Sequence, residues 1–414
     1  MDCGGLKMRK TTSEQCRAWQ GPAVFSYGFR PFFLFGAVWA AVAMVMWIFM
    51  LSTGFVLPTH LEPVSWHAHE FLFGSLGAII AGFLLTAVPN WTGRLPVVGW
   101  GLAALFALWL AGRFAMATSA LWPNVSAQLV DLSFPVVLGA VLLREIIAGR
   151  NWRNLVILIL LAIFTLANLL FHLDAAGGNI AAQGIGMRVG MSALIMMMCV
   201  IGGRVVPSFT RNWLVQQGAT RLPVPPMQRF DKAVLLITVI ALLLWVIAPS
   251  AVASGVALLM IGMLHFVRLG RWEGVQTLAQ PLLWILHVGY AFVPLGAVMI
   301  AGSILYPDVF SGAAAQHLWM AGAFGVMSMA MMSRATLGHT GQKLHAGRGT
   351  VVLFVSLITS VFTRLAAAFW PDAAMIFYAV SGVLWVGAFF GFALLYWPSL
   401  LKPKVTDSSR HAGT

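Results

Sequence analysis

The chain has 414 residues, of which 60% are hydrophobic and 9% are charged. An average soluble domain has about 25% charged residues, so this composition excludes a water-soluble protein and indicates an integral membrane protein. The formal net charge is +13. It does not indicate a nucleic-acid partner, because lysine and arginine also gather in the cytoplasmic loops of membrane proteins.

Twelve stretches are long and apolar enough to cross a bilayer, for which a helix needs about 20 mainly apolar residues. We therefore predict an all-α polytopic membrane protein, with a cytoplasmic N-terminal segment at 1–31, a twelve-helix transmembrane domain at 32–397 and a cytoplasmic tail at 398–414. The predicted segments are 32–53, 69–89, 97–117, 125–147, 154–173, 184–206, 232–249, 251–268, 281–303, 314–335, 349–369 and 374–397.

The positions of the basic residues predict the orientation of the chain. If the N-terminus is cytoplasmic, 22 of the 25 lysines and arginines fall on the cytoplasmic side, and the exceptions are Arg113, Arg188 and Arg364. We therefore expect both termini in the cytoplasm and the lipid bilayer as the main partner. The first thirty residues lack an apolar run followed by a cleavage site, so the first helix is expected to act as the membrane signal.

The second segment opens with WHAHEFLFG (66–74), and the tenth opens with AAQHLWM (314–320). A pair of imidazoles on two core helices is what a six-coordinate haem iron requires, so we predict His69 and His317 as axial ligands. The alternative is that both are histidines in interfacial water that hold no metal. Ionisable residues inside a membrane are costly, which favours the functional interpretation.

A short repeat supports this pairing. AVPNWTG (87–93), VVPSFTR (205–211) and ATLGHTG (335–341) close the second, sixth and tenth segments, and the residues 23 positions before their threonines are His69, Met187 and His317. Because these segments are four apart, the chain reads as three diverged four-helix units around a pseudo-threefold axis. The alternative is a chance similarity.

His67 needs a different role, because it lies about 200° around the helix from His69. It shares a helix face with Glu70, which is predicted to orient it. Together with His60 and His172, His67 forms a candidate copper site.

Arg113 and Arg188 are candidate partners of the haem propionates. The alternative is that they form buried salt bridges, for which Asp131 and Asp174 are available.

Two further histidines lie toward the predicted cytoplasmic side, His287 in WILHVGY (284–290) and His339 in LGHTG (337–341). They are candidates for a second metal centre or a proton path, and the alternative is a structural role.

The three cysteines have no CxxCH or metal-binding spacing, so any haem is expected to be non-covalent and of b type. Walker, GxGxxG and HExxH motifs are absent, which excludes nucleotide-driven transport and zincin proteolysis.

Five motifs in order resemble the NnrS family of bacterial membrane proteins over nearly the whole chain. They are SYGFRPFFLFGAVWA (26–40), WHAHEFLFG with AGFLLTAVPNWTG (66–93), GRVVPSFTR (203–211), WILHVGY and MMSRATLGHTG (331–341). The resemblance implies an inner-membrane protein that contains haem and copper and is linked to denitrification and nitric oxide tolerance. It makes metal-ligand candidates of His67, His69, His287, His317 and His339, without assigning them to metals.

Twelve helices in three units are also similar in architecture to haem-copper oxidases, although no HxxxY or adjacent histidines occur on the sixth and seventh segments. A standard oxygen-reducing site is therefore not expected. The leading hypothesis is an oxidoreductase of the nitric oxide reductase type that takes electrons from a quinol or another carrier. The alternatives are a non-enzymatic haem protein that senses or buffers nitric oxide, and a transporter with a histidine-lined path.

Overall fold

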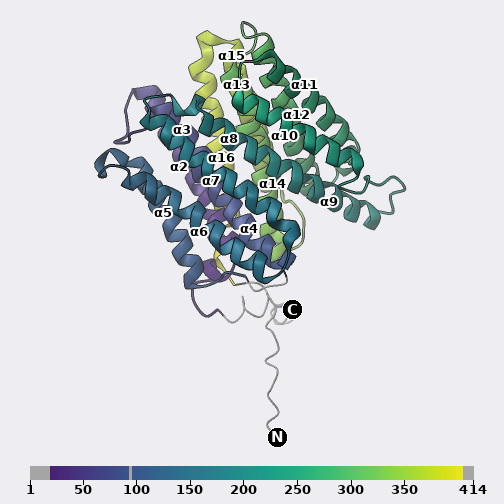
Figure 1. The fold of residues 1–414 in the computed structure, drawn as a ribbon. Coiled ribbons are helices and arrows are strands. Elements are labelled where there is room, and N and C mark those ends of the chain that lie inside the picture. Colours follow the sequence, from purple (N-terminus) through teal and green to yellow (C-terminus); the bar gives the residue numbers. More distant parts are fainter. Residues whose placement is uncertain (1–18, 93–95, 404–414) are drawn as a thin grey trace.

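The structure is a computed structural model that describes residues 19–92 and 96–403. Its regular elements are all helical, and no strand occurs in these ranges, which confirms the predicted fold class (Figure 1). Most of the predicted N-terminal segment and of the C-terminal tail lies outside the described residues, as do Arg94, Cys3 and Cys16.

Nine of the predicted segments are single helices in the described part of the chain. They are α2 (Phe29–Thr53), α5 (Trp100–Ala117), α6 (Ser126–Ala148), α7 (Leu155–Ala176), α10 (Arg229–Ile247), α11 (Val252–Gly270), α12 (Pro281–Leu305), α15 (Arg348–Phe369) and α16 (Ala374–Leu401).

The other three segments are composite columns, in which a π-helical stretch joins two α-helices. Column 2 consists of α3 (Pro63–His69), η2 (Glu70–Ser75) and α4 (Leu76–Thr92). Column 6 consists of α8 (Ile185–Met197), η6 (Met198–Gly202) and α9 (Gly203–Gln216). Column 10 consists of α13 (Gly312–His317), η8 (Leu318–Val326) and α14 (Met327–His339).

These columns are the same three segments that the sequence repeat relates. The π-helical stretches of columns 2 and 10 are in register, since Glu70 and Leu318 both precede the closing threonines, Thr92 and Thr340, by 22 residues. In column 6 the π-helical stretch begins later, at Met198. π-Helical turns widen a helix locally and are frequent at functional sites, so the columns are the first place to look for one.

Columns 2 and 6 form the core of the bundle. They are buried over 78% and 72% of their most apolar windows, whereas the nine single helices are buried over 28–50%. The outward faces of the single helices carry exposed aliphatic residues such as Leu236, Ile247 and Val383. Eleven of the described helices are long and apolar enough to span a membrane, and column 10 is the twelfth predicted span, divided by its long π-helical stretch.

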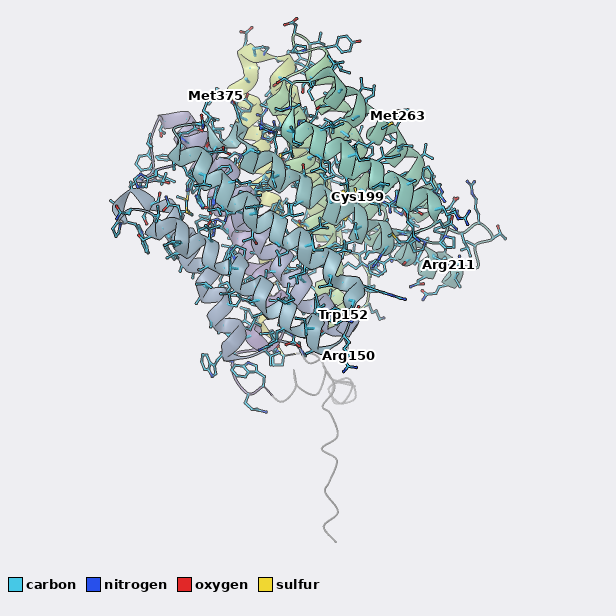
Figure 2. All side chains as sticks on the ribbon, viewed as in Figure 1. Arg150, Trp152, Cys199, Arg211, Met263 and Met375 are labelled. Carbon is cyan, nitrogen blue, oxygen red and sulfur yellow. The ribbon has the colours of Figure 1, made fainter. Side chains whose placement is uncertain are left out.

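The described chain begins and ends on one side of the bundle, here called the termini side. Arg30 at the start of α2 donates hydrogen bonds to the carbonyl oxygens of Leu400 and Lys402, at 3.0 and 2.6 Å, and so joins the first helix to the last. Arg150 lies toward the termini side and Met375 on the opposite side (Figure 2). This agrees with the distribution of basic residues; the orientation in the membrane stays a prediction.

Candidate metal centre

A buried polar cluster surrounds the junction of α3 and η2 in column 2. His69 ends α3 and Glu70 begins η2, and neither side chain has exposed surface. The surrounding helices contribute Arg113 from α5, Asp131 from α6, and Asn168 with His172 from α7, all at most 7% exposed. Their convergence needs four different helices, so it is a property of the tertiary fold.

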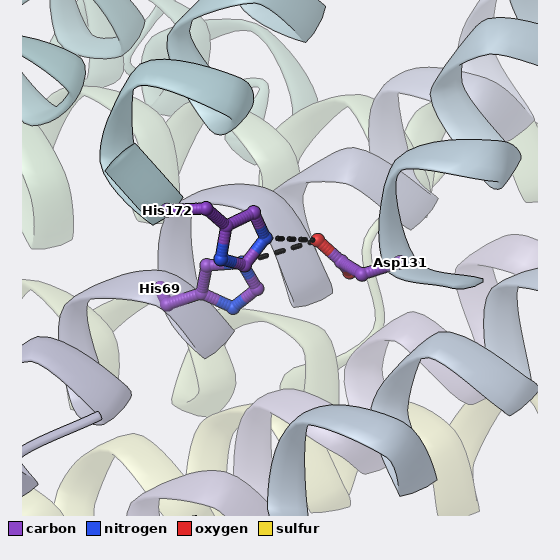
Figure 3. A group of neighbouring side chains, drawn as sticks. All are labelled: His69, Asp131 and His172. Atoms are coloured by element: carbon purple, nitrogen blue, oxygen red, sulfur yellow. Dashed lines mark hydrogen bonds and ion pairs between the residues drawn. The ribbon is translucent and has the colours of Figure 1, made fainter. Parts of the chain in front are cut away.

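His69 has an acceptor oxygen at each ring nitrogen. Its Nδ1 lies 2.9 Å from Glu70 Oε1, while its Nε2 lies 3.0 Å from Asn168 Oδ1 and 3.2 Å from Asp131 Oδ2. His172 Nε2 lies 3.1 Å from the same Asp131 oxygen, so both imidazoles point at one carboxylate (Figure 3). Ligand atoms of His69, Asp131 and His172 all lie within 4.8 Å of one another.

Arg113 joins the two carboxylates of the cluster. Its Nη1 donates to both oxygens of Glu70, at 2.7 Å each, and its Nη2 donates to Asp131 Oδ1. Trp39 Nε1 donates to Glu70 Oε2 at 2.7 Å, and Asn168 Nδ2 donates to Asp131 Oδ2 at 2.7 Å. Every carboxylate oxygen in the cluster therefore has a donor, as buried charges require.

The charges of this cluster leave room for one more cation. Two carboxylates face one guanidinium, so with both imidazoles neutral the cluster has one excess negative charge, which is costly in the interior of a membrane bundle. A second proton on His69 or a metal ion would supply the missing positive charge. Two imidazoles and a carboxylate are a donor set that suits iron, copper or zinc, and Glu70 on Nδ1 has the place of an orienting carboxylate.

The structure does not join the predicted axial pair His69 and His317 by any contact among the described residues. His317 is close enough to His67 and Arg364 for their charges to interact, and Arg364 acts on both histidines. His67 stacks on Trp47, with ring centroids 4.7 Å apart. Imidazoles from columns 2 and 10 therefore do approach each other, but through His67 rather than His69.

The histidines of the candidate copper site lie apart. His172 belongs to the buried cluster, His67 faces column 10, and His60 is exposed in the loop before α3, where its backbone N–H donates to Ser119 Oγ. No contact among the described residues joins the three. Glu70 likewise orients His69, its neighbour in the chain, whereas the sequence analysis paired it with His67.

One of the two predicted propionate partners, Arg113, has the alternative role of a buried salt bridge. Arg113 forms the ion pair with Asp131. Arg188 interacts with the charge of Asp174 and donates to the carbonyl oxygens of Gln183 and Val246, at 2.6 and 3.3 Å. Both guanidinium groups are thus engaged within the protein.

The other two predicted histidines lie on separate elements and hold no shared site. His287 Nε2 is 2.9 Å from Thr210 Oγ1, so it joins α12 to column 6. His339 stacks on Tyr27 and also contacts Phe29, with ring centroids 5.4 and 5.6 Å away. Their surroundings favour the structural alternative, and their role in a metal centre stays a prediction.

A second buried network, the inner polar cluster, was not predicted. His265 Nδ1 lies 2.9 Å from Tyr290 Oη, and its Nε2 lies 2.9 Å from Thr238 Oγ1 and 3.6 Å from Cys199 Sγ. Arg268 donates to Tyr290 Oη at 2.8 Å and pairs with Asp231 at 2.8 Å. The available signal was the His265 and Arg268 pair, three residues apart in an otherwise apolar segment, which places both on one helix face.

Tyr290→Phe is expected to lower the free energy of unfolding by about 1–3 kcal/mol, because it leaves His265 Nδ1 without its partner and removes one acceptor of Arg268. Thermal unfolding in detergent would measure the loss. Metal content is the internal control and should not change, since Tyr290 contacts none of the His69 cluster. A variant as stable as the parent would contradict the importance of this network.

Comparison with known proteins gives one family. The sequence profile described as NnrS protein matches residues 23–404, which is nearly the whole chain and includes all five motifs of the sequence analysis. A search of curated proteins gives no match. Because the matched range includes the three composite columns and every helix of the buried cluster, the chain belongs to the NnrS family.

Proposed function

We propose that this NnrS-family protein is a membrane metalloprotein that binds nitric oxide and reduces or otherwise detoxifies it. The observation that carries the proposal is the buried group of His69, Asp131 and His172, whose ligand atoms all lie within 4.8 Å of one another. Nitric oxide itself is implied by the family resemblance. It is a gas without charge, so it suits a site that is closed to ions by a surrounding helix bundle.

In this proposal His69, His172 and Asp131 hold an iron or copper ion. Three protein ligands leave coordination positions open, and the metal would supply a place where nitric oxide binds and receives electrons. Glu70 orients His69 through Nδ1, and Arg113 balances the carboxylate charges. Asn168, which hydrogen-bonds to both His69 and Asp131, keeps the two ligands in position.

The candidate ligands of a non-covalent haem in this proposal are His67 of column 2 and His317 of column 10, which are close enough for their charges to interact. His317 Nδ1 donates to the carbonyl oxygen of Ala313 at 2.7 Å, which leaves its Nε2 lone pair for a metal. The His67 side chain has no hydrogen bond to another described residue, and its ring stacks on Trp47. Arg364, which acts on both histidines and lies over the Tyr378 ring, is the candidate cation for a propionate in this proposal. The haem would pass electrons from a quinol or another carrier.

The first experiment is a visible spectrum of detergent-purified protein, oxidised and reduced, before and after nitric oxide is added, with metal analysis of the same sample. A low-spin haem spectrum with a second metal that responds to nitric oxide supports the proposal. Consumption of nitric oxide with a reductant separates an enzyme from a protein that only binds the gas. A folded protein without haem or metal contradicts the proposal and favours the transporter.

The proposed haem ligands are tested by comparing the His67→Ala variant with the His69→Ala variant. His67→Ala and His317→Ala are expected to lower haem content by about tenfold or more, since loss of even an outer partner of a ligand costs about 10–100-fold in affinity. His69→Ala should keep its haem and lose the other metal. The reverse result, with haem lost in His69→Ala and kept in His67→Ala, would support the axial pair predicted from the sequence.

A further inference from the structure

An apolar cavity lies where the three composite columns meet. Its volume is about 130 Å³, and each column contributes to its wall beside its π-helical stretch. Leu76 and Ile80 come from α4, Met198 and Gly202 from η6, and Phe324 from η8. Ser328 is the one residue with a polar side chain in the lining. The cavity is therefore a consequence of the column geometry rather than of one bulky or missing side chain.

A smaller crevice of about 10 Å³ is lined both by a residue of the cavity wall and by residues of the buried cluster. Phe73, Gly77 and Ile80 form one of its walls, on successive turns of column 2. Arg113, Asp131 and Asn168 form part of the other wall. Ile80 lines both spaces, so a single side chain separates the apolar cavity from the crevice that reaches the candidate metal centre.

The size and lining of the cavity restrict what it can hold. Ordered water needs about 2–4 polar partners, and an apolar cavity of about 150 Å³ in another protein stays dry and binds benzene or xenon. A cavity of about 130 Å³ with one hydroxyl suits a small molecule without charge, such as a diatomic gas.

We propose that this cavity receives an uncharged diatomic gas and that the gas reaches the His69 cluster past Ile80 and Gly77. The identity of the gas as nitric oxide rests on the proposed function. Occupation of the cavity by a gas does not rest on the proposed function, because occupation depends only on the volume and the apolar lining. The two parts can therefore be tested separately.

Xenon tests the cavity on the full-length protein without any metal requirement. Crystals under xenon pressure are expected to show xenon between Ile80, Met198 and Phe324. Ile201→Phe, which adds bulk from η6 to the lining, is expected to exclude xenon, whereas the matched Ile201→Leu variant of equal volume should keep it. Absence of xenon in the parent protein, or a lipid or quinone in the cavity instead, would overturn the proposal.

Substitutions at Gly77 test whether the gas reaches the His69 cluster through the crevice. A Cβ atom added at Gly77 meets no atom within 4 Å, so alanine is accommodated there and valine adds bulk to the crevice lining. Gly77→Val is expected to slow nitric oxide binding to the metal-loaded protein by about tenfold, equivalent to ~1.4 kcal/mol of barrier, and Gly77→Ala by less. Gly139→Val is the matched control, since its Cβ also meets no atom and it lies on α6 outside both linings.

The metal content and spectrum of the Gly77 variants should equal those of the parent protein, because Gly77 supplies no ligand. Equal binding rates in Gly77→Val and Gly139→Val would overturn the passage. A purified protein that contains no metal would contradict the proposed function, while xenon in its cavity would still support the gas site. A metal-loaded protein that takes up no xenon would overturn this inference alone.

Discussion

Arg113→Met is expected to lower the free energy of unfolding by about 3–5 kcal/mol, which is the usual cost of removing one partner from a buried ion pair. Arg113 is 2% exposed and donates to both Glu70 and Asp131. Without the guanidinium, two carboxylates remain in the same buried cluster with a single imidazole between them. Chemical or thermal unfolding in detergent, with yield from the membrane as a second readout, measures the loss.

Arg188→Met is the matched control for Arg113. Arg188 also lies in a helix and escapes the predicted cytoplasmic clustering, but it is partly exposed and bonds mainly to backbone carbonyl oxygens. Its loss should cost about 1 kcal/mol or less, as expected for an exposed pair. If the double variant Arg113→Met with Asp131→Asn is more stable than Arg113→Met alone, unpaired charge is the cause. Equal stability of Arg113→Met and Arg188→Met would contradict the assignment.

The second large effect concerns metal affinity. His172→Ala removes one of the three predicted ligands, and its affinity for iron or copper is expected to fall by at least about 100-fold, since even an outer partner contributes about 10–100-fold. Glu70→Gln keeps the shape of the side chain but weakens the acceptor at His69 Nδ1, so a smaller loss is expected. Elemental analysis after dialysis against a chelator, followed by titration with each metal, measures both.

His60→Ala is the control for His172, because His60 is exposed in a loop and contacts none of the cluster. It should retain the metal content of the parent protein. Loss of metal in His60→Ala together with retention in His172→Ala would reverse the assignment. Retention in both would mean that the cluster is neutralised by a proton on His69 rather than by a metal.

Most members of the buried cluster were named from the sequence, but they were assigned to different sites. WHAHEFLFG marked His69 and Glu70, which both lie in the cluster. Asp131 and His172 were named as well, but for a salt bridge and for a copper site with His60 and His67. Asn168 was not named at all. The reason is that the five residues come from three segments, and the spacing of residues in one chain does not tell which helix faces meet.

The short sequence repeat, although it has few identical residues, marked three structurally similar segments. The three closing motifs pointed to the segments that turn out to be composite columns, and the depth argument paired columns 2 and 10. His69 was chosen over His67 as the axial ligand, but the spacing alone cannot test that choice, because the register of a helix changes at a π-helical turn and such turns have no clear sequence signature. The choice depends on how each column packs.

The sequence by itself determined the class of the molecule and which of its segments are helical. Twelve apolar stretches must be helical in a bilayer, because no water is present there to satisfy an exposed backbone, and that requirement is local to each segment. Tertiary structure alone decided which polar groups meet, where the π-helical stretches fall and where the cavity lies. His69 and Asn168 are 99 residues apart, and only the packing of column 2 against α6 and α7 brings them together.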